Sequence, residues 1–308
     1  MSGPGRFAFD KSADSMRRNL FNLSISLIAL AFSLGCFWSS DRSGTVAAEP
    51  EEAGASNSEQ QPASRPENRA AAARKADKGD FVVEHLDVKT PKYLEIDKQV
   101  RSEMLLSKAA DKLNRALILP HDIYLRTKDC SENNAFYDSR DRSVTMCYEL
   151  MEDFFQTFKS SGQAEQAAYS KMFDAVRFVF LHEIGHALID AYKLPVSGNE
   201  EDAADRCSAF INITELGDEG VKNVMAAAEA FSIESKRGGS KRNLADEHLL
   251  QEQRFYNSLC MIYGSDQTKY ANIVSDGFLP KERASRCPVE FQRTVDAWGI
   301  LLGPWKKE

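Results

Sequence analysis

Two histidines stand four residues apart inside an apolar run, and a cluster of acids follows soon after. The run is FVFLHEIGHALIDAY, Phe178 to Tyr192, and it contains His182, Glu183 and His186. A spacing of four places both imidazoles on one face of an α-helix, close enough to share a metal ion, and Glu183 projects toward the open coordination position of that metal. The apolar residues between them belong to a core-facing surface. The stretch therefore predicts a partly buried helix with one polar face.

The polar face matches the HExxH pattern of zinc hydrolases. Zinc held by neutral imidazoles accepts a water molecule and lowers its pKa, and an adjacent carboxylate then takes the proton. We therefore expect His182 and His186 to bind the metal and Glu183 to act as the catalytic base. The alternative is that the two histidines are capped or surface residues, since HExxH also occurs by chance.

A site with two histidines needs a third protein ligand, and Glu201 lies 15 positions beyond His186. The intervening LPVSGN contains Pro195 and Gly198. These residues end the first helix and allow a second helix to return antiparallel across it. The spacing thus predicts that Glu201 completes the metal site.

The acids around Glu201 have different expected roles. Asp205 shares its helical face and is expected to accept the other ring N–H of a ligand histidine, His182. Glu200 and Asp202 are expected to point elsewhere and to serve as negative charge in the first turn of the helix.

A further group is needed to stabilise the oxyanion that forms when water attacks a carbonyl. His248, in the segment DEHLLQEQRFYN, is the candidate for this catalytic role, with Asp246 close enough to orient it. The simpler interpretation is that DEH caps the start of a helix.

The motifs of this chain resemble those of a known group of enzymes. HEIGH followed by EDAAD resembles the HExxH…ExxAD pattern of the gluzincin clan of zinc metallopeptidases. The segments NAFYDSRDRSVTMCYEL, HEIGHALID, EEDAADRCSAF and QRFYNSLCMIYG are similar to a family of bacterial metallopeptidases that was formerly a domain of unknown function, and the likeness covers most of residues 81–308. It implies a zincin-like fold, with His182, His186 and Glu201 as ligands and Glu183 as base.

The N-terminal region predicts export. Met16-Arg17-Arg18 precedes an apolar run that ends at Trp38, as in a signal peptide. Residues 1–48 are therefore expected to form a signal or anchor region, cleaved after Ala48, retained as a membrane tether, or lipidated at Cys36. The domain would then be periplasmic, secreted or membrane-anchored outside the cytoplasm.

Composition divides the rest of the chain in two. Residues 49–80 are rich in Glu, Pro, Ala, Ser and Gln and predict a disordered linker. Residues 81–308 are long enough for one catalytic domain with a sizeable core. The net charge of −7 comes without a basic stripe, so we expect no nucleic-acid partner. The oligomeric state is left open.

Five cysteines follow the signal region, and none of them form CxxC pairs. Cys130 and Cys147 flank a turn-rich segment that resembles a hairpin, and they predict a cross-strand disulfide. Cys260 with Cys287 is the second expected pair. Cys207 then remains as a free thiol, expected to be a small core residue.

Periodicity predicts an α+β domain with a small N-terminal sheet and a mainly helical remainder that carries the HExxH helix. We expect three short strands and six helices. The strands are Phe81–Val83, Ile123–Arg126 and Val144–Tyr148, and the helices are Ile96–Leu117, 164–192, 199–216, 219–236, 244–263 and 288–302.

Ser143 to Tyr148 is expected to form the exposed edge of the sheet and to bind an extended peptide. Taken together, the sequence predicts an exported zinc-dependent metallopeptidase that hydrolyses peptide bonds in peptide or protein substrates. The alternative is a tethered binding or scaffold protein, with a structural zinc or a cleft that does not cut.

Overall fold

The computed structural model describes residues 75–237 and 248–307. The expected signal region, Cys36, most of the expected linker and the start of the helix predicted at 244 lie outside these residues. Among the helices that are described, none has the length and apolar character needed to cross a bilayer.

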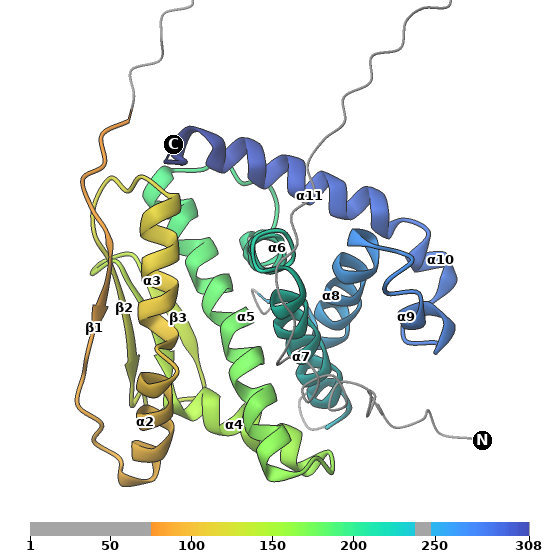
Figure 1. Ribbon diagram of the computed structural model, residues 1–308, viewed down its shortest axis with the longest axis horizontal. Helices are drawn as coiled ribbons and strands as arrows, with labels where there is room; N and C mark the ends of the chain where they lie inside the picture. Colours follow the sequence, from red (N-terminus) through yellow and green to blue (C-terminus); the bar gives the residue numbers. More distant parts are fainter. Residues whose placement is uncertain (1–74, 238–247, 308) are drawn as a thin grey trace, which may run out of the picture. The chain divides into compact units, whose positions relative to one another are not determined.

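The sheet has four strands in the order β1-β2-β4-β3 (Figure 1). β1 (Phe81–Glu84) pairs parallel with β2 (Ile123–Lys128), which pairs parallel with β4 (Ser143–Cys147). β3 (Ala135–Asp138) pairs antiparallel with β4. All three expected strands are confirmed, and β3 is the first arm of the expected hairpin.

The prediction that Ser143 to Tyr148 forms the exposed edge of the sheet was wrong. β4 is paired on both sides, with β2 and with β3, and all five of its residues are buried. The hairpin turn places β3 outside β4, so β3 forms that edge of the sheet. Tyr148, expected in the strand, instead begins the helix α4 (Tyr148–Ser160), which the sequence analysis had not predicted.

The helix expected over 96–117 is two helices. α2 (Leu94–Ser102) follows a short 3₁₀ turn, η1 (Pro91–Tyr93), and α3 (Leu105–Ala116) begins after Met104, whose φ of 53° is left-handed. The break reorients the chain, so the buried residues of both helices reach the same core.

α5 (Glu165–Tyr192) is the central helix and carries the HExxH motif. It packs against β3, β4 and α4 and also against the helices that follow it in sequence. Figure 1 shows it between the sheet and the C-terminal helices. More than half of its residues are buried, so it belongs to the core and exposes only part of its surface to the site.

The remainder is helical, as predicted. The helix expected at 199–216 is α6, which continues into a π-helical turn. Gly264 lies inside α8, where an added Cβ would meet the backbone of Cys287. These elements are α6 (Glu200–Phe210), η2 (Ile211–Glu215), α7 (Gly217–Lys236), α8 (Gln251–Ser265), α9 (Asn272–Ser275), α10 (Lys281–Ala284), α11 (Cys287–Leu302) and η3 (Gly303–Trp305). The class is therefore α+β, with a small N-terminal sheet and a mainly helical remainder.

Both expected disulfides are present. Cys130 is linked to Cys147, and Cys260 to Cys287. Cys130 lies in the loop after β2, so the first bond joins a loop to the end of β4 and does not cross the hairpin as expected. Cys207 is free and fully buried, as a small core residue would be.

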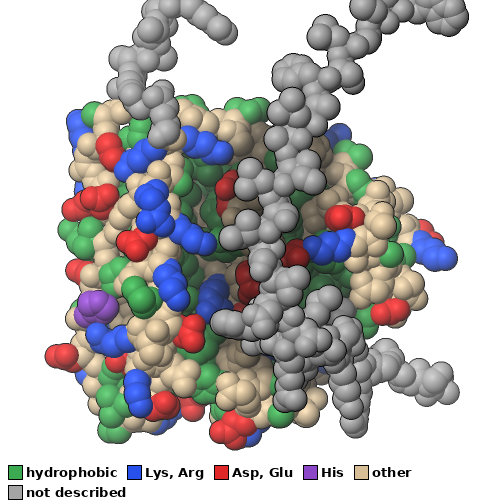
Figure 2. Space-filling view, viewed as in Figure 1, with side chains coloured by type: hydrophobic (Ala, Val, Ile, Leu, Met, Phe, Trp, Pro, Cys, Tyr) green, Lys and Arg blue, Asp and Glu red, His purple; other side chains and the backbone are tan. Residues whose placement is uncertain are grey.

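The fold includes a few residues before the expected boundary at Phe81. The N–H of Lys78 donates to the carbonyl of Leu119 at 2.8 Å, and the carboxylate of Asp77 forms an ion pair with Lys307 at 2.6 Å. The last part of the expected linker therefore pairs with the domain. On the described face in Figure 2, acidic and basic side chains are intermixed, with no extended field of one sign.

Candidate metal centre

The site is built where α5 and α6 cross closely. α5 ends at Tyr192 and is capped by Lys193, whose φ of 51° is left-handed. Asn199 caps the start of α6 by accepting a hydrogen bond from the N–H of Asp202. Gly185 allows the close approach, because an added Cβ would lie 3.1 Å from the Cα of Ala204 and 3.2 Å from the Cβ of Cys207. A side chain at position 185 would require its neighbours on α6 to shift by a few tenths of an ångström.

Three side chains converge at this crossing. The Nε2 atoms of His182 and His186 lie 3.2 Å apart. One carboxylate oxygen of Glu201 is 3.1 Å from Nε2 of His182, and the other is 3.4 Å from Nε2 of His186. The turn at Pro195 to Gly198 thus does return the chain so that Glu201 faces both histidines, as its spacing predicted.

These separations fit a zinc ion. Zinc bonds of about 2.0–2.2 Å at tetrahedral angles place neighbouring ligand atoms about 3.3–3.6 Å apart. The three measured separations, 3.1–3.4 Å, are close to that range. Two imidazoles and one carboxylate are also the donor set of hydrolytic zinc sites.

The Nδ1 atom of each histidine, on the side of the ring away from the centre of the site, is hydrogen-bonded to a carboxylate. Nδ1 of His182 lies 2.8 Å from Asp205, and Nδ1 of His186 lies 2.8 Å from Glu200. With each Nδ1–H donating to a carboxylate, each Nε2 faces the centre of the site, where it can hold a proton or bind a metal ion. The pairing of Asp205 with His182 matches the expectation. The prediction that Glu200 points elsewhere was wrong, whereas Asp202 does face away, toward Arg206.

Arg254 on α8 is the residue that sequence reasoning missed. Its guanidinium donates to both oxygens of Asp205, at 2.8 and 2.7 Å, and it packs over the ring of Phe231. Arg254 is only 9% exposed, so this is a buried, bidentate ion pair. A signal did exist in the sequence, because a buried position on a helix holds a charge only when a partner is present.

The carboxylates around the two histidines favour a bound cation. Burial by itself lowers the pKa of His182, but hydrogen bonds to Asp205 and Glu201 outweigh it and raise the pKa to about 9. Burial raises the pKa of Glu201, yet hydrogen bonds to both histidines hold that pKa below its ordinary value. The same negative charge that stabilises a proton here would stabilise a bound metal ion.

Glu183 and His248 also reach the site. Glu183 is 6% exposed, and its carboxylate lies 4.0 Å from Nε2 of His182. Nε2 of His248 lies 3.1 Å from Glu201, and its ring stacks at 6.2 Å on that of His182. Asp246, the expected partner of His248, lies outside the described residues. His182, Glu201 and His248 also form a group whose ligand atoms could hold a metal.

One cavity of about 1030 Å³, which we call the main cleft, is lined by the three candidate ligands together with Glu183, Glu200 and His248. Its opposite wall is β3, through Ala135, Phe136 and Tyr137. The hydroxyl of Tyr137 donates to Asp190 of α5 at 2.8 Å, which fixes β3 against the helix that carries the motif. The edge strand and the candidate ligands therefore face one another across the cleft.

A protein-family model described as "Putative metallopeptidase" matches residues 85–302. No curated protein and no solved structure matches the chain in the corresponding searches. The match covers more than two thirds of the sequence and includes every residue of the centre described above. A metallopeptidase family implies a metal cofactor and peptide or protein substrates, and the chain belongs to this family.

Proposed function

We propose that this protein is an exported zinc-dependent peptidase. The observation that carries the proposal is the convergence of His182, His186 and Glu201 at separations of 3.1–3.4 Å in the floor of a cleft. These three residues would hold the zinc ion, which supplies Lewis-acid activation of water for attack on a carbonyl.

The side chains around the three ligands each have a role in hydrolysis. Glu183, nearly buried beside His182, takes the proton from the attacking water and passes it to the leaving amine. His248 donates a hydrogen bond to the oxyanion of the scissile carbonyl. Asp205 and Glu200 hold the two histidines in the tautomer that leaves Nε2 free for the metal.

The substrate is proposed to lie along β3, not along β4 as the sequence had predicted. Among the described strands β3 pairs only with β4, so its other edge offers backbone donors and acceptors to an extended peptide. Substrate peptides N-methylated one position at a time should lose cleavage at alternating positions, because strand hydrogen bonds alternate. Loss without this alternation would contradict the orientation.

Export is proposed from the predicted signal region and is supported by the two disulfides, which persist in oxidising compartments. Cell fractionation tests this. The full chain should be found outside the cytoplasm, and a chain without residues 1–48 should remain inside. Equal distribution of both would contradict the proposal.

The catalytic proposal is tested by comparing wild type with Glu183→Gln on a mixed peptide library, with zinc content measured on the same samples. Glu165→Gln is the matched control, because Glu165 is exposed on the same helix. We expect Glu183→Gln to keep its zinc and to lose cleavage by at least about a hundredfold, with the control unchanged.

Two outcomes would overturn the proposal. If neither wild type nor variant cleaves any peptide, the protein is better described as a tethered binding protein. If His182→Ala retains full zinc occupancy and activity, the assignment of the metal ligands is wrong.

A further inference from the structure

A second cavity lies on the other side of the first turn of α6. It has a volume of about 750 Å³, within the range of ligand sites. Its wall includes Asp202 and Arg206 of α6 and Gln253, Tyr256 and Asn257 of α8. None of these five residues belongs to the candidate metal centre.

The second cavity adjoins the main cleft. Asn199, the cap of α6, lines both of them. The two following residues, Glu200 and Glu201, line the main cleft, whereas Asp202 lines the second cavity. His248 likewise lines the main cleft, and the next residue, Leu249, lines the second cavity. A polypeptide that leaves the main cleft past Asn199 therefore enters the second cavity.

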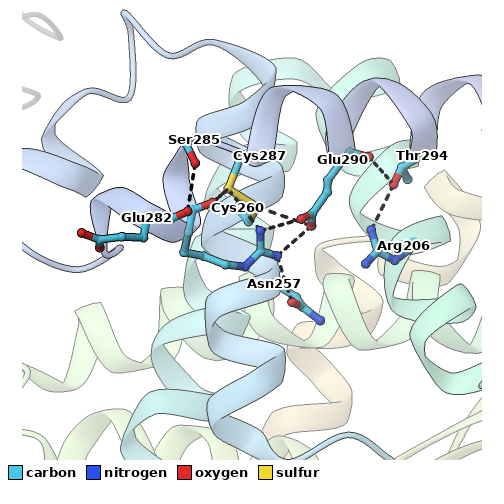
Figure 3. Close-up of a disulfide and its surroundings, with 9 residues drawn as sticks. Arg206, Asn257, Cys260, Glu282, Ser285, Cys287, Glu290 and Thr294 are labelled. Carbon is cyan, nitrogen blue, oxygen red and sulfur yellow. Dashed lines mark hydrogen bonds and ion pairs between the residues drawn. A yellow bond between two sulfur atoms is a disulfide. The ribbon is translucent and has the colours of Figure 1, made fainter.

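The carboxylate and amide side-chain oxygens of the second cavity already have hydrogen-bond partners. Asp202 accepts from Arg206 at 2.7 Å and from Asn257 at 3.4 Å. The oxygen of Asn257 accepts from Arg283, which also forms a bidentate ion pair with Glu290 (Figure 3). The amide oxygen of Gln253 accepts from the N–H of Leu250. The charges in this wall are thus compensated from within the protein.

Several donors remain. Within the described residues, Nη2 of Arg206, Nε2 of Gln253 and the hydroxyl of Tyr256 have no hydrogen-bond acceptor. Nε of Arg206 donates to Asp202, and its Nη1 donates to Thr294 (Figure 3). Tyr256 is 39% exposed, so its ring is open to a ligand. A surplus of donors that includes a guanidinium suits a carboxylate, which accepts charge-assisted hydrogen bonds.

The main cleft has the opposite character. Its walls contain the carboxylates of Glu183, Asp190, Glu200 and Glu201, and Lys193 is the only lysine or arginine among its described lining residues. Lys193 is itself paired with Asp190 at 2.7 Å. The carboxylates of Glu183, Glu200 and Glu201, which have no lysine or arginine partner in this cleft, outnumber the two positive charges of one zinc ion. An acidic side chain is therefore disfavoured along the main cleft and favoured beyond Asn199.

We propose that the second cavity is an extended substrate subsite that binds an acidic side chain of a polypeptide lying across both cavities. This inference rests on the proposed function for the identity of the ligand as a polypeptide. Its test measures binding and does not require cleavage.

The experiment uses the full, zinc-loaded chain with Glu183→Gln, so that bound peptides are not cut. Fluorescent peptides of one neutral sequence, with a single Glu, Gln or Lys moved along it, are titrated by anisotropy. We expect one position at which the Glu peptide binds about tenfold or more tightly than the Lys peptide.

Gln253→Glu is the decisive variant, because it retains the oxygen that caps Leu250 while replacing the donor with a negative charge. It should abolish or reverse the preference, and Tyr256→Phe should weaken it. Gln166→Glu, an exposed position that lines neither cavity, makes the same charge change and should leave the preference intact.

The inference is overturned if Glu and Lys peptides bind alike at every position, if no peptide binds, or if the preference survives Gln253→Glu. Its failure is distinguishable from failure of the proposed function. A protein that cleaves peptides without acidic preference refutes only the subsite, and one that shows the preference but never cleaves refutes only the catalysis.

Discussion

Asp205 and Arg254 are joined by two parallel hydrogen bonds, of 2.8 and 2.7 Å, directly behind His182. Arg254 holds the pKa of Asp205 below its ordinary value, against the effect of burial, so Asp205 is ionised when it accepts the hydrogen bond from the Nδ1–H of His182. The candidate metal site is thus supported by a residue on α8, more than 50 positions beyond Glu201.

Arg254→Lys should weaken zinc binding about 10- to 100-fold, the usual effect of losing an outer-shell partner. A lysine cannot reproduce the bidentate contact with Asp205. Competition with a zinc chelator, measured well below the unfolding temperature, separates affinity from stability. Arg101→Lys, on an exposed ion pair with Asp97, is the control and should bind zinc as wild type does. Unchanged affinity in Arg254→Lys would contradict the positioning role.

Glu200→Gln should lower zinc affinity by about tenfold or less, below the 10- to 100-fold effect of losing an outer-shell partner altogether. The amide oxygen can still accept the hydrogen bond from the Nδ1–H of His186, but the substitution removes one negative charge beside the site. Asp202→Asn makes the same charge change two residues later on the opposite side of α6 and should leave zinc affinity unchanged. Equal effects of both variants, in the same chelator competition, would show that only net charge matters.

Gly185→Ala sets two effects against each other. Alanine favours a helix over glycine by about 1 kcal/mol, but here its Cβ would press on Ala204 and Cys207 at 3.1–3.2 Å. We expect little gain in stability and a clear loss of zinc affinity, because α6 and Glu201 move away from the histidines. Gly299→Ala, in α11 with nothing within 4 Å, should raise the melting temperature and leave zinc affinity unchanged.

The pH dependence of stability should reflect Glu234. Burial, with the charge of Asp153, raises its pKa from 4.5 to about 7, against the influence of Arg254 and Arg237. A group whose folded pKa is raised contributes stability that is complete below its unfolded pKa and is lost as pH rises through the folded one. From about pH 4.5 to above 7, wild type should therefore lose stability that Glu234→Gln retains.

The measurement is the melting temperature across this pH range, where the gap between Glu234→Gln and wild type should widen by a few degrees as pH rises. An amide at position 234 can also donate to the buried oxygen of Gln251, which lacks a partner among the described residues. Glu219→Gln, exposed on the same helix, should follow wild type. A gap that narrows with rising pH would contradict the sign.

The candidate ligands could be predicted because their geometry is local. Two histidines four apart share a face of any α-helix, and the turn at Pro195 and Gly198 limits where Glu201 can return. The two cysteine pairs were also accessible, because a predicted export signal favours disulfides and Cys130 and Cys147 flank a hairpin-like segment. Pairing Cys260 with Cys287 then left Cys207 as the free thiol.

Other features depend on contacts between distant segments, which no local pattern encodes. β4 has strand character in the sequence, but only the parallel pairing with β2 places it inside the sheet and leaves β3 at the edge. The break at Met104 likewise follows from packing two helices on one core.

The sequence by itself determined that this chain has a helix able to present His182, Glu183 and His186 together, followed by a helix that can supply an acid. Only the tertiary structure decided that Glu200 supports His186, that Arg254 supports Asp205, and that a donor-rich cavity lies beyond Asn199. The physical reason is that helix periodicity acts over a few residues, whereas the crossing of α5 and α6 and the docking of α8 depend on close packing across the whole core.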